Sequence, residues 1–425
     1  MIKILKYGEI APEEIFARGT SAKDVSGVVA EIIQNVKESG DKAIKEYCLK
    51  FDGAKLDSLK VSEQELKDAI NSVQPKFLRI LRQAAKNIRA FHKKQVRKGF
   101  TIKKTNGVIL GQKITPIEKV GLYVPGGTAA YPSTVLMDAI PALIAGASEI
   151  VMTTPPDKNG KINPAILAAA SVAGVTKIYK VGGAQAIAAL AFGTESIPRV
   201  YKIVGPGNAF VAEAKKQVFG QVSIDMIAGP SEIMIVSDGK SDPTFIAADL
   251  LSQAEHDKMA SAVLITDTEE FSAKVQAEIE RQLPLLLRKD IARVSVDDNG
   301  KIIVAKNLEQ AIEIANVIAP EHLELCVDEP FKYLDKVKNA GSVFLGRSCP
   351  EALGDYFAGP NHTLPTSGTA KFSSPLSVDD FIKKTQFTFY TEDALSKVAN
   401  KVAYFAKKEG LTAHATSATV RGEKK

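Results

Sequence analysis

The sequence predicts an α/β protein with two doubly wound units, helices before them and a helical tail after them. From about residue 107 onward, short apolar runs of β type alternate with segments of helical pattern. Four consecutive runs each end at a turn that contains glycine or proline. This alternation is typical of a parallel sheet whose two faces are covered by helices.

The composition fits a globular chain with more than one core. The chain has 425 residues, of which 45% are apolar and 24% charged, so it is long enough for two or more domains. The net charge is +6, and the basic residues are spread along the chain. A nucleic-acid groove needs a concentrated basic stripe, so we expect no nucleic-acid partner.

The ends and the cysteines of the chain predict a cytoplasmic protein. The first residues lack the apolar core of a signal peptide, and no apolar run reaches the length of a membrane span. Cys48, Cys326 and Cys349 make an odd number of cysteines in a long chain. That usage fits a reducing compartment, and we expect no membrane partner.

Two amphipathic helical regions are predicted near the N-terminus. The first covers residues 21–40, with Ser21 as its cap and Gly40 as its end. The second covers about residues 62–95 and begins at Ser62, with Glu65 in the capping-box position. We assign residues 1–119 to this helical region and to the start of the first α/β domain.

Residues 120–230 are predicted to form an inserted nucleotide-binding domain of Rossmann-like type. Its predicted strands cover residues 120–124, 149–152, 177–181 and 201–204. Glycine turns follow these strands at Gly126-Gly127, Gly182-Gly183 and Gly205-Pro206-Gly207-Asn208. Ligands of such sheets bind at the carboxyl ends of the strands, where these turns lie. None of the turns matches G-x-G-x-x-G, so nucleotide binding and plain strand–helix connections both stay open.

A second α/β unit, also Rossmann-like, is predicted over residues 231–377 and a helical tail over residues 378–425. Its strands are predicted at residues 232–236, 262–265, 302–304, 323–327 and 342–345, with helices from 243, over 269–287 and over 308–318. In the tail, Thr391 can cap a helix that ends before Gly410. The apolar face of this helix needs a partner surface, which we expect on a second subunit.

Polar residues of the second half can be gathered into one site. Gln253 and His256 are three apart in the last turn of the helix that begins at Asp242-Pro243, so their side chains can converge on a metal ion. Taken singly, each candidate also has a plain interpretation. These are a polar helix end, a solvated turn at Glu321-His322, an Asx turn at Asp355 and a frayed tail at His414. Together, one Gln, two His and one Asp form a nitrogen and oxygen set that suits zinc.

The chain resembles the histidinol dehydrogenase family in motifs that run along nearly its whole length, in the family's order. These motifs are GLYVPGG at 121–127, VGGAQAIAAL at 181–190, GPGNAF at 205–210, AGPSE at 228–232, LLSQAEH at 250–256, PEHL at 320–323 and LTAH at 411–414. The resemblance implies oxidation of L-histidinol to L-histidine through the aldehyde, in two NAD-dependent steps that close histidine biosynthesis. It also implies a homodimer whose sites draw on both subunits.

The resemblance implies a role for each matching residue. Zinc, one ion per subunit, would be held by Gln253, His256, Asp355 and His414. NAD would contact Tyr123, Gln185 and Asn208. Substrate would contact Ser231, Gln253, His256, Glu321, His322, Asp355, Glu409 and His414, with Glu321 and His322 as the catalytic residues.

The chemistry of this reaction suits those residues. An alcohol must lose a proton as its hydride leaves, and His322 is a base of near-neutral pKa. The aldehyde must then take up water, which Glu321 can activate, while zinc acts as a template for the substrate. Cys326 lies in an apolar run, where a buried and inert thiol is expected, so no covalent thiol step is needed. Three alternatives stay open: a zinc hydrolase, a related dehydrogenase of another amino or hydroxy alcohol, and a metal-binding scaffold without activity.

Overall fold

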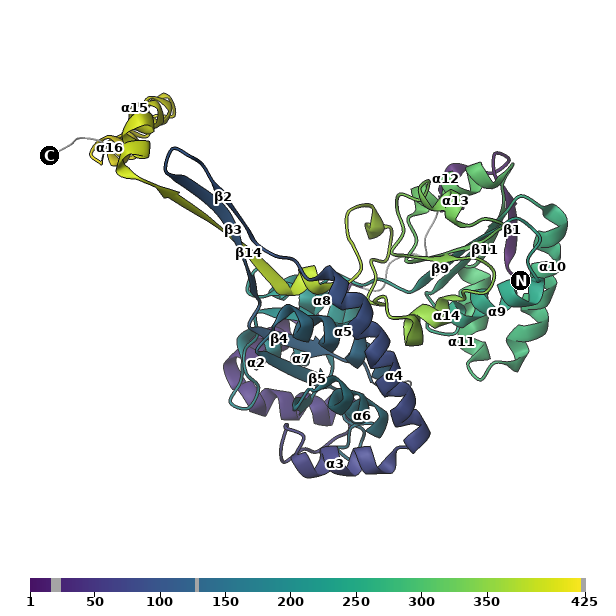
Figure 1. The fold of residues 1–425 in the computed structure, drawn as a ribbon. Helices are drawn as coiled ribbons and strands as arrows, with labels where there is room; N and C mark the ends of the chain where they lie inside the picture. The colour runs from purple at the N-terminus through teal and green to yellow at the C-terminus, as the bar shows by residue number, and fades with distance from the viewer. Residues whose placement is uncertain (17–23, 127–129, 422–425) are drawn as a thin grey trace. The chain divides into compact units, whose positions relative to one another are not determined.

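A computed structural model describes residues 1–16, 24–126 and 130–421 (Figure 1). The chain forms two compact units, each built from two stretches of sequence. The first unit consists of Met1–Gln95 and Glu118–Phe381, and the second of Val96–Ile117 and Ile382–Lys425. Among the described residues, none of the helices combines the length and the apolar character that crossing a bilayer requires.

One parallel sheet of the first unit has five strands in the order β6-β5-β4-β7-β8. The strands are β4 (Lys119–Tyr123), β5 (Glu149–Thr154), β6 (Lys177–Lys180), β7 (Lys202–Val204) and β8 (Ser223–Ile224). The helices that connect them are α5 (Pro132–Ala145), α6 (Pro164–Ala173), α7 (Gly183–Phe192) and α8 (Ala209–Val218). The strand order reverses between β4 and β7, and a crevice at such a switch point is where doubly wound sheets bind ligands.

The other parallel sheet of the first unit has six strands in the order β1-β11-β10-β9-β12-β13. The strands are β1 (Lys3–Lys6), β9 (Glu232–Ser237), β10 (Ser261–Thr266), β11 (Lys301–Val304), β12 (His322–Cys326) and β13 (Ser342–Leu345). Its helices include α1 (Pro12–Phe16), α9 (Pro243–Ala254), α10 (Glu269–Gln282), α11 (Lys289–Asp298), α12 (Leu308–Ile318) and α13 (Phe331–Leu334). With two doubly wound parallel sheets, the predicted fold class is confirmed.

The six-stranded sheet is buried on both faces because successive residues of a strand point to opposite sides. In β9, Ile233 and Ile235 join a core with α9 and α10, whereas Met234 and Val236 join a core with α12. Each fully buried side chain of this kind contributes roughly 1.5–3 kcal/mol relative to an exposed one. The continuous apolar run of β9 is therefore what a central parallel strand requires.

The helices before the first sheet differ in part from the prediction. The capping box of Ser62 and Glu65 is confirmed, but the predicted region is two helices, α3 (Glu63–Ser72) and α4 (Pro75–His92), because Pro75 starts a new helix. The predicted helix end at Gly40 is confirmed in part. Within α2 (Ser26–Tyr47) the backbone at Gly40 is not helical, with φ of 50° and ψ of −129°, and a second helical stretch follows this kink. The predicted cap Ser21 and the turn residue Gly127 lie outside the described residues.

Further differences concern helix ends. The helix predicted over residues 269–287 ends at Gln282, because Pro284 follows in a short 3-10 turn (Leu283–Leu285), and α11 was not predicted. Past β13, α14 (Glu351–Leu353) continues into a π-helical turn, Gly354–Ala358.

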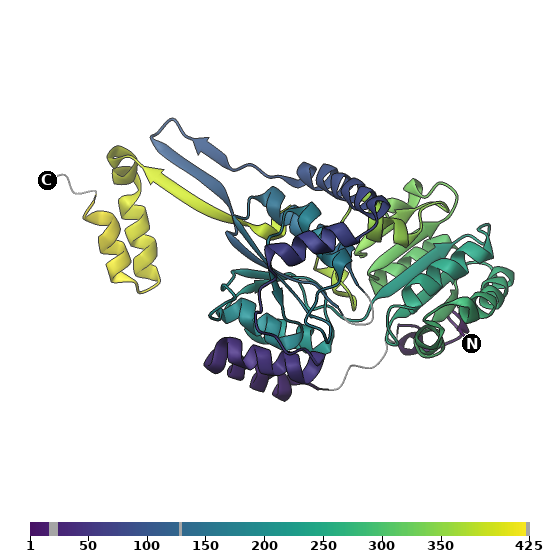
Figure 2. The same cartoon turned by 90° about the horizontal axis from the view of Figure 1, so that it is seen from below.

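The second unit contains an antiparallel sheet that the sequence analysis did not predict. Its strands are β2 (Phe100–Lys103), β3 (Val108–Pro116) and β14 (Ile382–Tyr390), in the order β14-β3-β2. They are followed by α15 (Glu392–Lys408) and α16 (Thr412–Thr419), which pack on each other as a helical pair (Figure 2). The cap at Thr391 is confirmed, since its side chain accepts a hydrogen bond from the Ala394 N–H, and Gly410 follows the helix with φ of 77°.

Candidate active site

The predicted catalytic residues lie at the amino edge of the six-stranded sheet. Glu321 and His322 stand at the start of β12, beside Glu232 at the start of β9. Helix α9 leaves the carboxyl end of β9 and runs back along the sheet, so its last turn carries Gln253 to the same edge. This is the edge opposite to the one at which parallel sheets usually bind ligands.

His322 is the centre of the cluster and is 3% exposed. Its Nδ1 atom lies 3.0 Å from the Glu232 carbonyl oxygen and 3.1 Å from Gln253 Nε2. The Glu321 carboxylate, 3.7 Å from Nδ1, accepts a hydrogen bond of 2.9 Å from the Glu232 backbone N–H. Since a carbonyl oxygen can only accept, a neutral His322 that donates from Nδ1 has Nε2 as its basic nitrogen.

The Nε2 side of His322 faces two carboxylates. Asp355 Oδ1 lies 3.6 Å and Glu351 Oε1 lies 3.8 Å from Nε2. One ligand atom from each of these three residues lies within 4.8 Å of the other two. Among the described residues, neither His322 Nε2 nor Glu351 Oε1 has a hydrogen-bond partner, although both atoms are buried. Buried nitrogen and oxygen atoms without a hydrogen-bond partner, grouped in this way, are typical of a site that takes a cation.

The segment that carries Asp355 also brings His362 to the cluster. His362 Nδ1 lies 3.8 Å from Asp355 Oδ1, and its Nε2 lies 3.3 Å from Thr134 Oγ1 of α5. Thr363 Oγ1 donates to Asp138 Oδ1 of the same helix at 2.9 Å. The five-stranded part of the first unit therefore holds the segment that completes the site.

Burial and mutual charge shift the pKa values in the cluster. Burial raises the pKa of Glu321 to about 7, and burial together with the charge of Asp355 raises the pKa of Glu351 to about 8. Burial alone would lower the pKa of His322, but the carboxylates of Glu321, Asp355 and Glu351 raise it to about 10. Burial alone would raise the pKa of Asp355, but His322 and His362 hold it well below its usual range. The cluster thus favours one positive charge among its carboxylates.

The structure brings together part of the predicted zinc set. Gln253 is buried, His256 is half-buried and Asp355 lies beside His322 in the cluster. Burial lowers the pKa of His256, while the charge of Asp355 acts in the opposite direction. Ser231 lies directly before β9 at the same edge. Glu409 and His414 belong to the second compact unit, where both are exposed.

Two residues of the cluster were missed by the sequence analysis. Neither Glu351 nor His362 was assigned a role. A signal for Glu351 was available, because it precedes Asp355 by four positions and residues at that spacing share a helix face. Glu351 is held by Ser252 Oγ, which donates to its carboxylate at 3.1 Å.

The predicted NAD contacts lie at the carboxyl edge of the five-stranded sheet. The Tyr123 hydroxyl accepts a hydrogen bond of 3.2 Å from the Gly183 N–H, and a Cβ at Gly183 would lie 2.7 Å from Gln185 Oε1. Asn208 caps α8, because its Oδ1 accepts from the N–H groups of Phe210 and Val211, the second and third residues of the helix. Tyr123 ends β4 and Asn208 follows β7, the two strands that flank the switch point, whereas Gln185 follows the edge strand β6.

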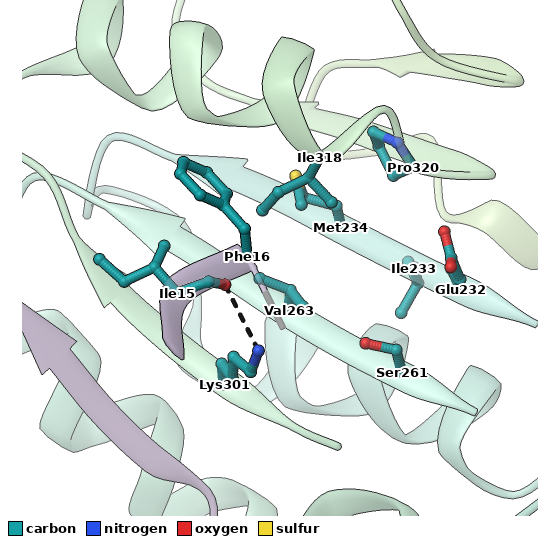
Figure 3. A pocket seen from close by; sticks show the side chains of 10 residues that line it. All are labelled: Ile15, Phe16, Glu232, Ile233, Met234, Ser261, Val263, Lys301, Ile318 and Pro320. Carbon is teal, nitrogen blue, oxygen red and sulfur yellow. Dashed lines mark hydrogen bonds between the residues drawn. The ribbon is translucent and has the colours of Figure 1, made fainter. Parts of the chain in front are cut away.

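A small cavity adjoins the catalytic edge (Figure 3). It lies beneath α1, where Lys301 Nζ donates to the Ile15 carbonyl oxygen at 3.4 Å. Its lining includes Phe16, Glu232, Met234, Ile318 and Pro320. With a volume of about 20 Å³, the cavity has room for about one water molecule and none for a substrate.

Known proteins of one family match this chain over nearly its whole length. The family model described as histidinol dehydrogenase matches residues 17–422. A histidinol dehydrogenase from Clostridium acetobutylicum is 54% identical over 426 residues, which cover 99% of both chains. One from Geobacillus kaustophilus is 56% identical over 396 residues, which cover 93% of both chains.

The fold of the chain also matches a known structure. The crystal structure of histidinol dehydrogenase from Elizabethkingia anophelis superposes with a TM-score of 0.94 at 40% identity. The superposition covers 99% of this chain and 98% of the other. The chain therefore belongs to the histidinol dehydrogenase family and is an oxidoreductase.

Proposed function

We propose that the protein oxidises L-histidinol to L-histidine through histidinal and passes two hydrides to NAD, as the last step of histidine biosynthesis. The observation that carries this proposal is the buried pair of Glu321 and His322, with His322 Nε2 unpartnered and directed at Asp355. A proton acceptor with a free nitrogen is what an alcohol needs when its hydride leaves.

Zinc fits the donors that surround Asp355. Gln253, His256 and Asp355 offer an amide oxygen, an imidazole nitrogen and a carboxylate oxygen, and the imidazole of His414 would complete a four-ligand set. One ligand atom from each of His322, Glu351 and Asp355 lies within 4.8 Å of the other two. Asp355 is the only residue that this group shares with the proposed zinc ligands. We assign His322 to proton transfer because its Nδ1 is already engaged by the Glu232 carbonyl. When bound, zinc supplies a positive charge that orients the substrate nitrogens and favours the neutral form of His322.

The chain's own residues supply the proton transfers. His322 Nε2 would accept the proton of the substrate hydroxyl, and NAD, when bound, would supply the acceptor of the hydride. Glu321, held by the Glu232 N–H, then takes a proton from the water that adds to the aldehyde carbon. The resulting hydrate is an alcohol again. Once His322 has passed the first proton to solvent, it can accept a hydroxyl proton of the hydrate as the second hydride leaves. Burial of both side chains limits the access of bulk water to the reacting atoms.

Support for NAD comes from the switch point between β4 and β7. Tyr123 and Asn208 lie at the carboxyl ends of these two strands, and Gln185 follows the edge strand β6 of the same sheet. Asn208 caps the N-terminus of α8, and a helix N-terminus favours phosphate groups. We assign these three residues to cofactor binding.

We propose a cytoplasmic homodimer with shared active sites. The second unit supports the dimer. Glu409 and His414 follow α15, whose side chains Val402 and Phe405 are 46% and 68% exposed. An apolar helix face of this kind needs a surface, and a second copy of the chain would supply one. The substrate is the only small-molecule partner that we propose besides the cofactor, with neither nucleic acid nor membrane involved.

Measurement of NADH formation from L-histidinol tests the proposal. Two NADH per histidinol, with histidine as the product, are expected. One NADH with an accumulating aldehyde would contradict the second oxidation. Turnover of another amino alcohol alone would favour a related dehydrogenase, and NAD-independent hydrolysis would favour a zinc hydrolase.

A further inference from the structure

Lys215 is among the most deeply buried side chains of the described residues. It lies on the inward face of α8 and is 1% exposed. Lysine is almost never fully buried unless its charge is paired. Its partner is Asp225, which follows β8 and whose side chain is 1% exposed.

This buried pair holds both polar backbone groups of Gly205. Lys215 Nζ donates to the Gly205 carbonyl oxygen at 3.0 Å. The Gly205 N–H donates to Asp225 Oδ2 at 2.8 Å, and the Met226 N–H donates to Asp225 Oδ1 at 2.7 Å. The backbone groups of Gly205 and Met226 therefore satisfy the ion pair. In return, the ion pair holds both the N–H and the carbonyl group of Gly205.

Gly205 begins the turn that leads from β7 to Asn208. Its φ of 115° and its position require glycine, because a Cβ there would lie 2.0 Å from the Tyr123 carbonyl oxygen. At the other end of the turn, the Asn208 side chain caps α8. The path of residues 205–208 is thus fixed at its start by the ion pair and at its end by the cap.

We propose that Lys215 and Asp225 are positioning residues that hold the turn 205–208 in the shape that binds the dinucleotide. The inference rests on the proposed use of NAD at this turn. Neither side chain is exposed enough to contact the cofactor, so both act through the backbone of Gly205. An ion pair that served only stability would leave NAD affinity unchanged once the protein is folded.

The experiment compares NAD binding by the full-length wild type and Lys215→Met, using titration calorimetry with NAD as the probe. We expect the Kd for NAD to rise about tenfold or more, as the loss of a charge-assisted hydrogen bond implies. The zinc content is expected to stay unchanged, because the proposed metal ligands belong to α9 and the turn after it, to the π-helical turn and to the second unit, and not to the turn 205–208. A Kd within about twofold of wild type would overturn the inference, since twofold is well below the effect of such a bond.

Lys202→Met is the matched control. Lys202 is a second buried lysine of the same sheet, with Nζ 3.8 Å from Asp380 Oδ1. It lies close enough to interact with the charges of Asp225 and Lys215, but among the described residues its side chain donates no hydrogen bond to the turn. We expect this variant to lower the midpoint of thermal unfolding while leaving the Kd for NAD near the wild-type value. An equal loss of NAD affinity in both variants would show a general effect of buried charge and overturn the inference.

A double variant separates positioning from folding. Lys215→Met with Asp225→Asn removes both charges, so no unpaired charge stays buried and thermal stability should exceed that of Lys215→Met alone. NAD affinity should stay low, because the Gly205 carbonyl still lacks its donor. Recovery of NAD affinity together with stability would overturn the inference. Failure of the wild type to bind NAD would overturn the proposed function as well, whereas binding that survives Lys215→Met would overturn the inference alone.

Discussion

His322 directs its Nε2 atom at Asp355, with 3.6 Å between the two side-chain atoms, although they come from a strand and a π-helical turn. The contact joins the proposed proton acceptor to the proposed metal ligand. Because both side chains are buried, a change in one alters the charge felt by the other.

Removal of a metal ligand should empty the site without unfolding the chain. His256→Ala is expected to lose bound zinc and at least roughly a hundredfold in activity, because one of the proposed ligands is gone. Metal analysis and circular dichroism check this. Asp257→Asn, at the exposed neighbouring position, is the control and should keep its zinc. Full zinc in His256→Ala would refute the ligand assignment.

The three cysteines should be dispensable for both oxidation steps. Cys48 and Cys326 are buried, and burial raises the pKa of the Cys48 thiol to about 12 and that of Cys326 well above its usual range. Neither thiol is therefore a nucleophile near neutral pH. A folded variant with Cys48, Cys326 and Cys349 changed to Ala or Ser should oxidise both histidinol and added histidinal. Selective loss of aldehyde oxidation would point to a thiohemiacetal instead.

Substitution of the catalytic pair should separate the two steps. Glu321→Gln keeps the shape of the side chain but cannot take a proton, so oxidation of added histidinal should fall by roughly 10²–10⁴ and by more than oxidation of the alcohol. His322→Asn should slow every step that deprotonates an alcohol or a hydrate. Single-turnover rates on each substrate check this. Equal losses on both substrates in Glu321→Gln would contradict the division of roles.

Asp138 should make stability depend on pH. Burial, reinforced by the charge of Asp225, raises the pKa of Asp138 to about 8, against roughly 3.9 in an unfolded chain. Between these values the folded state binds the proton and the unfolded state does not. The contribution of Asp138 to the free energy of unfolding therefore falls as pH rises from about 4 to about 8.

Asp138→Asn removes this titration and keeps an oxygen that can accept from Thr363. Urea unfolding at several pH values should show that the variant loses less stability than wild type between about pH 5 and pH 8. Parallel pH curves for the two proteins would mean that Asp138 titrates normally.

Mixed dimers test whether the site is shared. Asp355→Ala and His414→Ala should each be inactive alone. In a shared site, one site of each mixed dimer carries both defects and the other carries neither. Random pairing yields mixed dimers about half the time, so activity should return to about a quarter of wild type. Inactivity of verified mixed dimers would place each site within a single chain.

The sequence alone determined the features that depend on neighbours along the chain. Asp242 caps α9 through Thr244 and Pro243 starts it, as predicted, but the helix ends at Ala254, so His256 lies in the turn beyond it and not in its last turn. The β–α alternation likewise predicted the two parallel sheets except for their strands β1 and β8. Such signals are local, because caps, turns and apolar periodicity act over a few residues.

Only the tertiary structure decided which charges meet and which distant strands pair. The spacing of Glu351 from Asp355 indicates a shared helix face, but only the fold shows that Glu351 faces His322. Likewise, nothing near Lys215 in the sequence indicates that Asp225 neutralises it. The polar strand β14 was missed because its partner β3 lies in a remote stretch of the chain. A buried charge or an edge strand is stable only with a partner, and the fold, rather than the flanking residues, supplies that partner.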